Sequence, residues 1–204
     1  MKRIVLASAS PRRKALLSGI GLKFKTESSN FQEEVPRGLE PHDLVRSMSL
    51  KKAQAVAARH RNALVIAADT VGVLDGQILG KPHSVQDARA MLEQLSGWSH
   101  TVITGFTIID TGDNKTLSRS VETRVYFKRL TQQDIDAYVN TGEPLDKAGA
   151  YALQGLGGLL VERIEGDCSN VIGLPLSALA EALEEFGVNV LEENALRFPR
   201  PRSR

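Results

Sequence analysis

The residues of this chain that could do chemistry are charged side chains in places where local rules disfavour them. Arg12 and Arg13 follow Ser10-Pro11, a pair that predicts a helix start with Ser10 as N-cap and Pro11 in the first turn. Cations at this end oppose the helix dipole. The two arginines are therefore either solvated or join the free backbone N–H groups to bind an anion.

Lys52 and Asp69 each interrupt an apolar pattern. Lys52 falls near the middle of the apolar stripe predicted for a helix over 42–60. A lysine there either extends its ammonium group to solvent or points at a buried anion. Asp69 follows the apolar run ALVIAA at 63–68, which is typical of a strand buried on both faces. A carboxylate at the end of such a strand either caps a turn or lies where ligands of α/β sheets bind.

Further charged residues lie in predicted loops. Lys81 follows a glycine, but GQILGKP has neither the spacing nor the hydroxyl of a P-loop, so we reject that motif. Lys81 can still reach a phosphate as a point charge. Glu33 and Glu34 are either solvated or, with Asp69, hold a hard divalent ion. Cations and acids in this mixture suit a metal-bridged polyphosphate, with an acid that activates water.

The elements that must position these residues alternate between apolar runs and helical patterns. We expect strands over 3–7, 63–68, 100–110, 118–127 and 158–164, and a hairpin over 71–79 that turns at Asp75-Gly76. Helices are expected over 11–19, 42–60, 84–95, 131–140 and 175–186. This order predicts an α/β fold with a mixed central sheet flanked by helices. Trp98 is expected to pack on the core and Cys168 to be a small packing residue.

Length and composition indicate one ordinary globular domain. The chain has 204 residues, of which 42% are hydrophobic and 25% charged, values that exclude a disordered or fibrous protein. We place a single domain at 1–190 and a basic, disordered tail at 191–204. A single cysteine excludes an intrachain disulfide framework and favours a reducing compartment. No apolar run is long enough for a membrane span, and the first ten residues are too polar for a secretory signal.

The charge balance does not predict a nucleic-acid partner. The net charge is +2, but four arginines lie in the last eight residues, and the rest of the chain without them carries −2. Aromatic residues make up only 5% of the chain, which disfavours a stacking platform for single strands. A single-strand binder that uses the tail is therefore the weakest of the alternatives.

Seven ordered segments together resemble the Maf family. They are LASASPRRKALL (6–17), FQEEVP (31–36), KKA (51–53), AADT (67–70), LGKP (79–82), DKAGAYALQG (146–155) and NVIGLPL (170–176). The resemblance runs from about residue 4 to residue 186. It implies nucleoside triphosphate pyrophosphatases with a fold similar to the inosine triphosphatase group and an active-site cleft between two lobes.

The resemblance also implies roles for individual residues. Phosphate-site residues are Ser8, Arg12 and Arg13. The essential acids and lysines are Glu33, Asp69, Lys52 and Lys81, with Asp69 as proton acceptor and with Glu33 and Asp69 as ligands of Mg²⁺ or Mn²⁺. The chain departs from many members at Gln32, where an acid is common, and Glu34 is the residue that would compensate.

Three positions that match the family's specificity sites, Arg12, Thr70 and Gln154, indicate the branch that acts on dTTP and UTP. The resemblance therefore implies a hydrolase of acid anhydrides that releases pyrophosphate from these nucleotides and from modified uridine triphosphates, as a cytoplasmic homodimer that cleans the nucleotide pool. The alternative from another class is a regulatory protein that binds a nucleotide or a division partner without hydrolysis. Pyrophosphate release from dTTP distinguishes the two.

Overall fold

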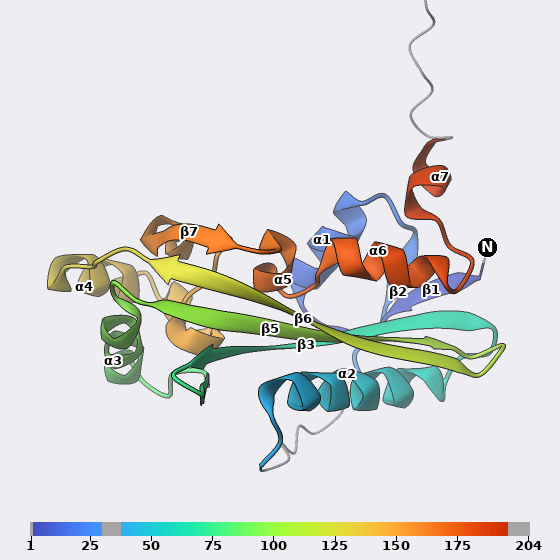
Figure 1. Ribbon diagram of the computed structural model, residues 1–204, viewed down its shortest axis with the longest axis horizontal. Helices are drawn as coiled ribbons and strands as arrows, with labels where there is room; N and C mark the ends of the chain where they lie inside the picture. Colours follow the sequence, from blue (N-terminus) through green and yellow to red (C-terminus); the bar gives the residue numbers. More distant parts are fainter. Residues whose placement is uncertain (1, 30–37, 196–204) are drawn as a thin grey trace, which may run out of the picture.

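A mixed seven-stranded sheet forms the centre of the fold in a computed structural model that describes residues 2–29 and 38–195 (Figure 1). The sheet order is β2-β1-β3-β5-β6-β7, with β4 paired to β3. β1 runs parallel to β2 and β3, whereas the other pairs are antiparallel. The strands are β1 (Arg3–Leu6), β2 (Phe24–Thr26), β3 (Ala63–Leu74), β4 (Gln77–Leu79), β5 (Ser99–Asp110), β6 (Lys115–Phe127) and β7 (Val161–Glu165). The predicted α/β fold with a mixed central sheet is confirmed.

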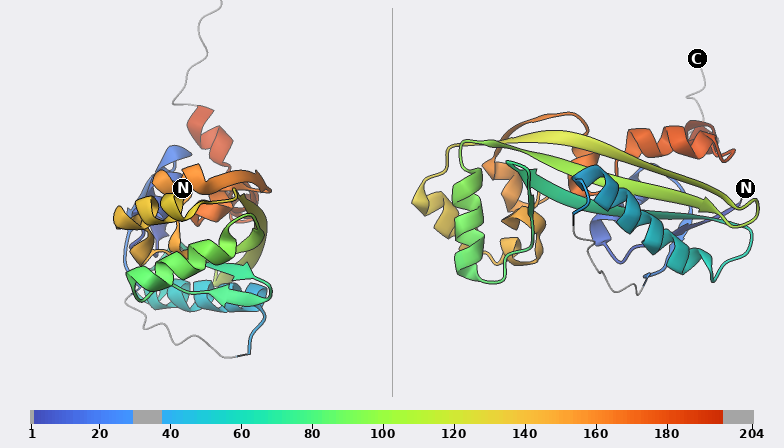
Figure 2. Two further views of the ribbon diagram at one scale, coloured as in Figure 1. Left: turned by 90° about the vertical axis from the view of Figure 1, so that its left-hand side faces the viewer. Right: turned by 60° about the horizontal axis from the view of Figure 1, so that its bottom comes forward.

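Helices cover both faces of this sheet. One face is covered by α2, and α1 and α6 lie on the opposite face (Figures 1 and 2). α3 and α4 lie at the far end of the long strands (Figure 1). The α-helices are α1 (Pro11–Gly19), α2 (Pro41–Ala57), α3 (Val85–Leu95), α4 (Gln132–Asn140), α5 (Cys168–Ile172), α6 (Leu176–Glu184) and α7 (Val190–Ala195). The 3₁₀ helices of the described residues are η1 (Glu143–Asp146), η2 (Ala148–Ala150) and η3 (Leu156–Leu160).

The alternation of β3 side chains divides the core around it into two layers. Val65 and Ala67 are fully buried in a cluster with Val56 of α2. Leu64 and Ile66, one residue out of phase, are buried in another cluster that includes residues of α1 and α6. Because successive strand residues point to opposite faces, the same alternation decides which face each later residue of β3 reaches.

Local signals in the sequence predicted the start of α1 and the first hairpin. The side chain of Ser10 accepts a hydrogen bond from the Arg13 backbone N–H at the N-terminus of α1, and Pro11 is its first residue. Asp75 and Gly76 join β3 to β4 with φ angles of 48° and 76°. Two successive positive φ values are those of a type I′ hairpin turn, the geometry that an Asp-Gly pair favours.

Several expectations about single elements were wrong. β3 does not end near residue 68 but continues to Leu74, because its antiparallel pairing with β5 continues through Asp69 and Thr70. Asp69 therefore lies inside a strand and not at its end. The segment expected as a strand over 158–164 begins as 3₁₀ helix η3. Trp98 is 70% exposed and does not pack in the core, and Cys168 is exposed at the start of α5.

The C-terminal segment begins as a helix. The first five residues of the predicted tail, 191–195, belong to α7, and Asn194 of this helix donates a hydrogen bond to the Ile20 carbonyl at the end of α1 (2.8 Å). The prediction of a disordered tail from 191 therefore does not apply to this helix, which is held against α1. Residues 196–204 lie outside the described part of the chain.

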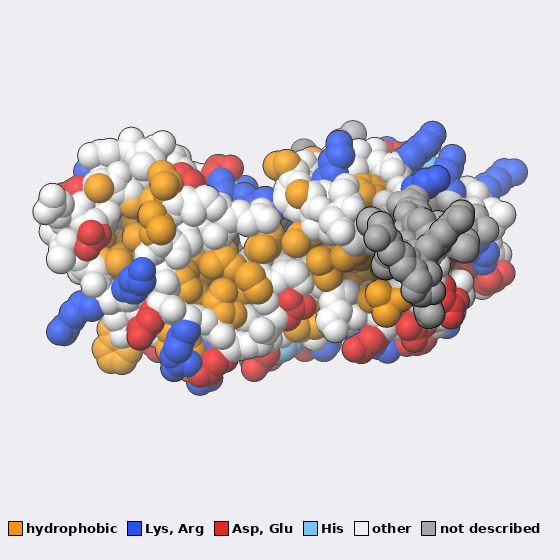
Figure 3. All heavy atoms as spheres, turned by 90° about the horizontal axis from the view of Figure 1, so that it is seen from above, with side chains coloured by type: hydrophobic (Ala, Val, Ile, Leu, Met, Phe, Trp, Pro, Cys, Tyr) orange, Lys and Arg blue, Asp and Glu red, His pale blue; other side chains and the backbone are white. Residues whose placement is uncertain are grey.

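The long strands β3, β5 and β6 connect two halves of an elongated molecule (Figure 2). A separate apolar cluster fills the half that carries α3 and α4 and includes Leu92, Phe127 and Tyr151. Hydrophobic side chains are also visible on the surface of that half (Figure 3), where Leu159 is 66% exposed. None of the helices in the described ranges is long and apolar enough to cross a membrane.

Candidate active site at the open edge of β3

Among the described strands, one edge of β3 lacks a partner in the middle of the sheet. Pairing with β1 ends at Ile66, and pairing with β4 begins at Gly72. Because β5 occupies the opposite edge along this whole stretch, residues 67–71 form an open edge among the described strands. Asp69 and Thr70 lie in this open edge. A ligand placed there can reach side chains on both faces of the sheet.

Asp69 points toward α2 and is paired with Lys52. The Lys52 Nζ atom lies 2.5 Å from Asp69 Oδ1, and the two side chains are 11% and 16% exposed. Of the two alternatives for Lys52, the structure shows the one in which its ammonium group points at a buried anion. A buried charge is tolerated when it is paired and hydrogen-bonded. The pair therefore holds a negative and a positive group together beside the open edge.

Thr70 points to the opposite face, where Arg13 of α1 contacts it. Arg13 Nη2 donates to Thr70 Oγ1 (3.1 Å), and Arg13 Nε donates to the Gly173 carbonyl (2.8 Å). Gly173 follows α5 and has a φ of 125°, a conformation that favours glycine. These bonds hold the guanidinium group over the open edge. The arginine is therefore fixed by the fold rather than solvated.

Arg12 and Lys81 lie on the side of η1 and η2. Lys147 and, more weakly, Arg12 lower the pKa of Asp146, so Arg12 lies near the end of η1. The Gly149 backbone N–H donates to the Gly80 carbonyl (2.9 Å), which places Lys81 beside η2. Lys81 is exposed, and no contact within the described residues joins it to Lys52 or Asp69.

Ser8 and Gln154 complete the predicted residues that the structure describes. Ser8 lies two residues after the end of β1 and is 8% exposed, and its hydroxyl accepts a hydrogen bond from the Ser10 backbone N–H (3.2 Å). Gln154 is exposed in the bend between η2 and η3. Within the described residues, no hydrogen bond joins Gln154 to the other site residues, and its exposure leaves it accessible to a ligand.

The predicted metal pair is described only in part, because Glu33, like Gln32 and Glu34, lies outside the described residues. No group of three or more metal-ligating side chains gathers within 2–29 and 38–195. Asp69 supplies one carboxylate whose Oδ1 atom is taken by Lys52. Mg²⁺ usually takes one or two protein carboxylates together with substrate phosphates and waters. Asp69 therefore fits the place of a single protein ligand.

Two buried or half-buried residues at the site were missed from the sequence. Thr104 of β5 lies opposite Thr70 in the strand register, and their hydroxyl oxygens are 2.9 Å apart. Lys147 is paired with Asp146 and is only 14% exposed. The signal for Lys147 was present in the segment DKAGAY, where no charged residue was selected. Thr104 became recognisable only through the strand register.

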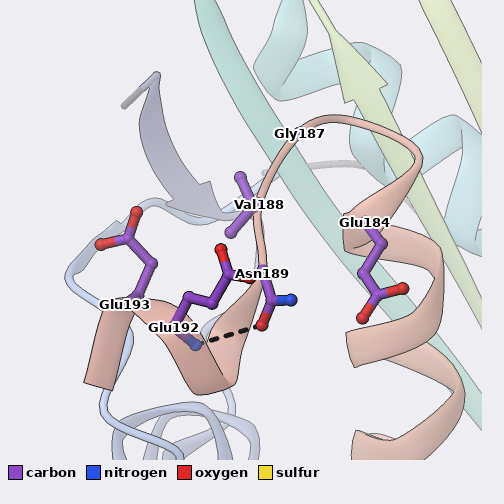
Figure 4. Close-up of a pocket in the computed structure, with 6 residues that line it drawn as sticks. All are labelled: Glu184, Gly187, Val188, Asn189, Glu192 and Glu193. Carbon is purple, nitrogen blue, oxygen red and sulfur yellow. Dashed lines mark hydrogen bonds between the residues drawn. The ribbon is translucent and has the colours of Figure 1, made fainter. Parts of the chain in front are cut away.

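Two cavities elsewhere on the surface do not contain the predicted residues. One of about 530 Å³ lies between α6 and α7 and is lined by Glu184, Glu192 and Glu193 (Figure 4). Three carboxylates repel a polyphosphate, so this cavity is unsuited to one. A second, of about 430 Å³, lies beside α4 and includes the apolar side chains of Leu156 and Leu159. The open edge of β3 thus remains the candidate site.

The chain is similar to known proteins over nearly its whole length. Proteins named dTTP/UTP pyrophosphatase are 50% identical over 190 residues in Moorella thermoacetica (93% of this chain and 98% of the relative) and 48% identical over 191 residues in Pelotomaculum thermopropionicum (94% and 100%). Another in Methanococcoides burtonii is 48% identical over 194 residues (95% and 100%). The Ham1 protein of Staphylococcus aureus matches in structure with a TM-score of 0.45 and 17% identity, over 63% of this chain and 73% of that chain.

The family match covers every described residue placed at the open edge. The model of the family described as Maf-like protein matches residues 3–186, a range that contains all the elements from β1 to α6. The chain belongs to the Maf family.

Proposed function

We propose that this chain is a nucleoside triphosphate pyrophosphatase that hydrolyses dTTP and UTP to the nucleoside monophosphate and pyrophosphate. The observation that carries the proposal is the partly buried Lys52–Asp69 pair at the open edge of β3. It is supported by relatives that are 44–50% identical over nearly the whole chain and are named for this activity. No covalent intermediate is required, since positioning and charge stabilisation account for most of the rate in such reactions.

Asp69 is the proton acceptor in this proposal. Water attacks the α-phosphorus, the bond from that phosphorus to the bridging oxygen breaks, and pyrophosphate leaves with the bridging oxygen. The proton of the attacking water passes to Asp69. Lys52 donates to Oδ1, which fixes the orientation of the carboxylate that acts as the base.

The cations around the edge stabilise the triphosphate. Arg13 is held in place by Thr70 and Gly173, so its guanidinium group is oriented at the open edge before the substrate binds, and a guanidinium group suits phosphate oxygens. Arg12 and Lys81 approach from the side of η1 and η2. Their charge balances the negative charge that develops on the departing pyrophosphate.

A divalent cation, Mg²⁺ or Mn²⁺, belongs to the proposal. Asp69 and Glu33 are the residues that would hold it, and when bound it neutralises phosphate oxygens and polarises the phosphorus centre. Two carboxylates are the protein ligands that Mg²⁺ commonly takes, together with waters and substrate phosphates.

Gln154 is the proposed base-recognition residue. Its amide carries both donors and an acceptor, so it can pair with the edge of uracil or thymine. Its exposure in the bend before η3 leaves this amide accessible.

We further propose that the enzyme acts as a homodimer in the cytoplasm. Sedimentation equilibrium tests the dimer.

The experiment that tests the activity is a hydrolysis panel. The full chain is incubated with each canonical nucleoside triphosphate and with modified uridine triphosphates, with Mg²⁺, Mn²⁺ or chelator, and products are separated by anion exchange. The proposal predicts dTMP or UMP together with equimolar pyrophosphate, and loss of turnover with chelator. Nucleotide binding without product would instead favour the regulatory protein.

A further inference from the structure

Three polar side chains are fully buried beneath the open edge of β3, where an unpaired hydroxyl or amide would be costly. Thr104 of β5 and Asn170 of α5 are 0% exposed, and Thr123 of β6 is 1% exposed. None of them was predicted to belong to the site. Their hydrogen bonds nevertheless lead directly to Thr70 and Arg13.

A continuous series of hydrogen bonds joins these residues. Arg13 Nη2 lies 3.1 Å from Thr70 Oγ1, and Thr70 Oγ1 lies 2.9 Å from Thr104 Oγ1. Thr104 Oγ1 in turn donates to the Asn170 carbonyl oxygen at 2.9 Å. The series thus starts at a charged donor and ends at a backbone acceptor.

The chemistry of the two ends decides where every hydroxyl proton lies. A threonine hydroxyl has one proton to donate. The Asn170 carbonyl can only accept, so the Thr104 proton is used there. Thr104 must then accept from Thr70, which commits the single Thr70 proton to Thr104. At the other end the guanidinium of Arg13 can only donate, and Thr70 accepts from it.

The acceptor end of the series is held rigidly. The Asn170 side-chain amide donates to the Val102 carbonyl (3.0 Å) and to Thr123 Oγ1 (3.0 Å). These bonds tie α5 to β5 and β6. The carbonyl that takes the Thr104 proton therefore has a fixed position relative to the sheet.

We infer that Thr104 is a positioning residue that sets the polarity of Thr70: it takes the Thr70 proton, so that Thr70 presents only acceptor lone pairs to Arg13 and to a bound nucleotide. The functional part of this inference rests on the proposed activity. A hydroxyl with this polarity holds the arginine for phosphate and offers no donor to a phosphate oxygen. The substrate group that lies against Thr70 is then a hydrogen-bond donor.

The test compares Thr104→Val, which removes the hydroxyl at nearly constant volume, with Thr104→Ser, which keeps it. Thr107→Val is the matched control, because Thr107 is also 0% exposed on β5 and its hydroxyl bonds only Ser49 and Ser118 among the described residues. We expect kcat/KM for dTTP to fall about 10-fold in Thr104→Val and to stay within about threefold in Thr104→Ser and Thr107→Val. Urea unfolding of each variant separates stability from activity.

A double-mutant cycle distinguishes positioning from a general structural effect. In a Thr70→Val background, Thr104→Val is expected to change kcat/KM by less than about twofold, because the hydroxyl through which it acts is gone. An undiminished loss in that background, or an equal loss in Thr107→Val, overturns the inference. If Thr104→Val does not fold, Thr104→Ala is used in the same cycle.

Measurements on the wild-type protein distinguish failure of the proposed activity from failure of the inference about Thr104. If it releases no pyrophosphate from dTTP, the proposed function fails, and affinity for α,β-methylene-dTTP, measured by calorimetry in the same variants, takes the place of kcat/KM. An active wild type with unchanged Thr104→Val overturns the inference alone. A wild type that neither hydrolyses dTTP nor binds the analogue overturns both.

Discussion

At the scale of single residues, the proposed chemistry depends on the ion pair between Asp69 and Lys52. Asp69→Asn keeps the shape and an oxygen that accepts from Lys52, but removes the base. We expect kcat/KM for dTTP to fall at least ~100-fold and the free energy of unfolding to fall by only roughly 1–2 kcal/mol.

The control for this prediction is Asp75→Asn, which makes the same chemical change in the exposed turn between β3 and β4, where the φ of 48° suits Asn. It should retain wild-type turnover. Retention of dTTP hydrolysis within about threefold in Asp69→Asn would show that this carboxylate is not the base.

His100 is a second residue whose chemistry follows from burial. It is 3% exposed, its Nε2 atom lies 2.9 Å from the Tyr151 hydroxyl, and burial lowers its pKa to about 4. Between this value and the ordinary 6.5 the unfolded chain binds a proton that the folded chain does not. Stability is therefore complete above pH 6.5 and is lost as the pH falls toward 4, by up to about 3 kcal/mol.

Urea unfolding of the wild type and of His100→Gln at pH 7.5 and pH 4.5 measures this effect. Carboxylates contribute equally to both proteins, so the comparison isolates the imidazole. The wild type should lose more stability between the two pH values than the variant does. Equal losses would contradict a neutral buried imidazole.

At the scale of elements, the packing of α2 on β5 is the contact that positions Lys52 beside Asp69. A Cβ atom added to Gly105, the β5 residue opposite Asp69, would clash with the carbonyl carbon and oxygen of Val45 in α2. Since Lys52 is on the same helix, the missing side chain at Gly105 allows α2 to bring Lys52 to Asp69.

Gly105→Ala should therefore push α2 away from the sheet. We expect a loss of about 1–3 kcal/mol in unfolding free energy together with a fall in kcat/KM that exceeds the change in stability at the assay temperature. Gly19→Ala, where an added Cβ meets nothing within 4 Å, is the control and should be neutral or stabilising. Wild-type behaviour of Gly105→Ala would show that α2 does not need this close approach.

Local patterns predicted most elements, because caps, turns and hydrophobic periods are properties of neighbouring residues. The start of α1 and the Asp75-Gly76 turn are examples. The extent of β3 was not predictable in this way. Asp69 and Thr70 look like the end of a strand, but β5 supplies partners that continue it to Leu74.

The site was predictable by residue type and not by arrangement. Lys52 stood out because a lysine in an apolar stripe must either reach solvent or meet an anion, and the structure shows that it meets Asp69. The placement of Asp69 and Thr70 on opposite faces, and the role of Thr104, depend on strand register between distant segments. The exposure of Trp98 could not be foreseen either, because nothing in the local sequence shows which elements cover it.

At the scale of the whole molecule, the proposed activity belongs to the part of the chain matched by the family, residues 3–186. The four C-terminal arginines lie beyond it. Removal of residues 197–204 should change kcat/KM for dTTP by less than about twofold and leave the salt dependence of the reaction unaltered. A loss of more than tenfold, or a steep salt dependence that disappears with the segment, would assign the arginines to substrate or nucleic-acid binding.

The most direct test of the central claim is hydrolysis of dTTP in ¹⁸O-labelled water, with the products analysed by mass spectrometry. Water attack at the α-phosphorus, with Asp69 as base, places the label in dTMP and leaves pyrophosphate unlabelled. Label in pyrophosphate, or products dTDP and labelled inorganic phosphate, would contradict the account.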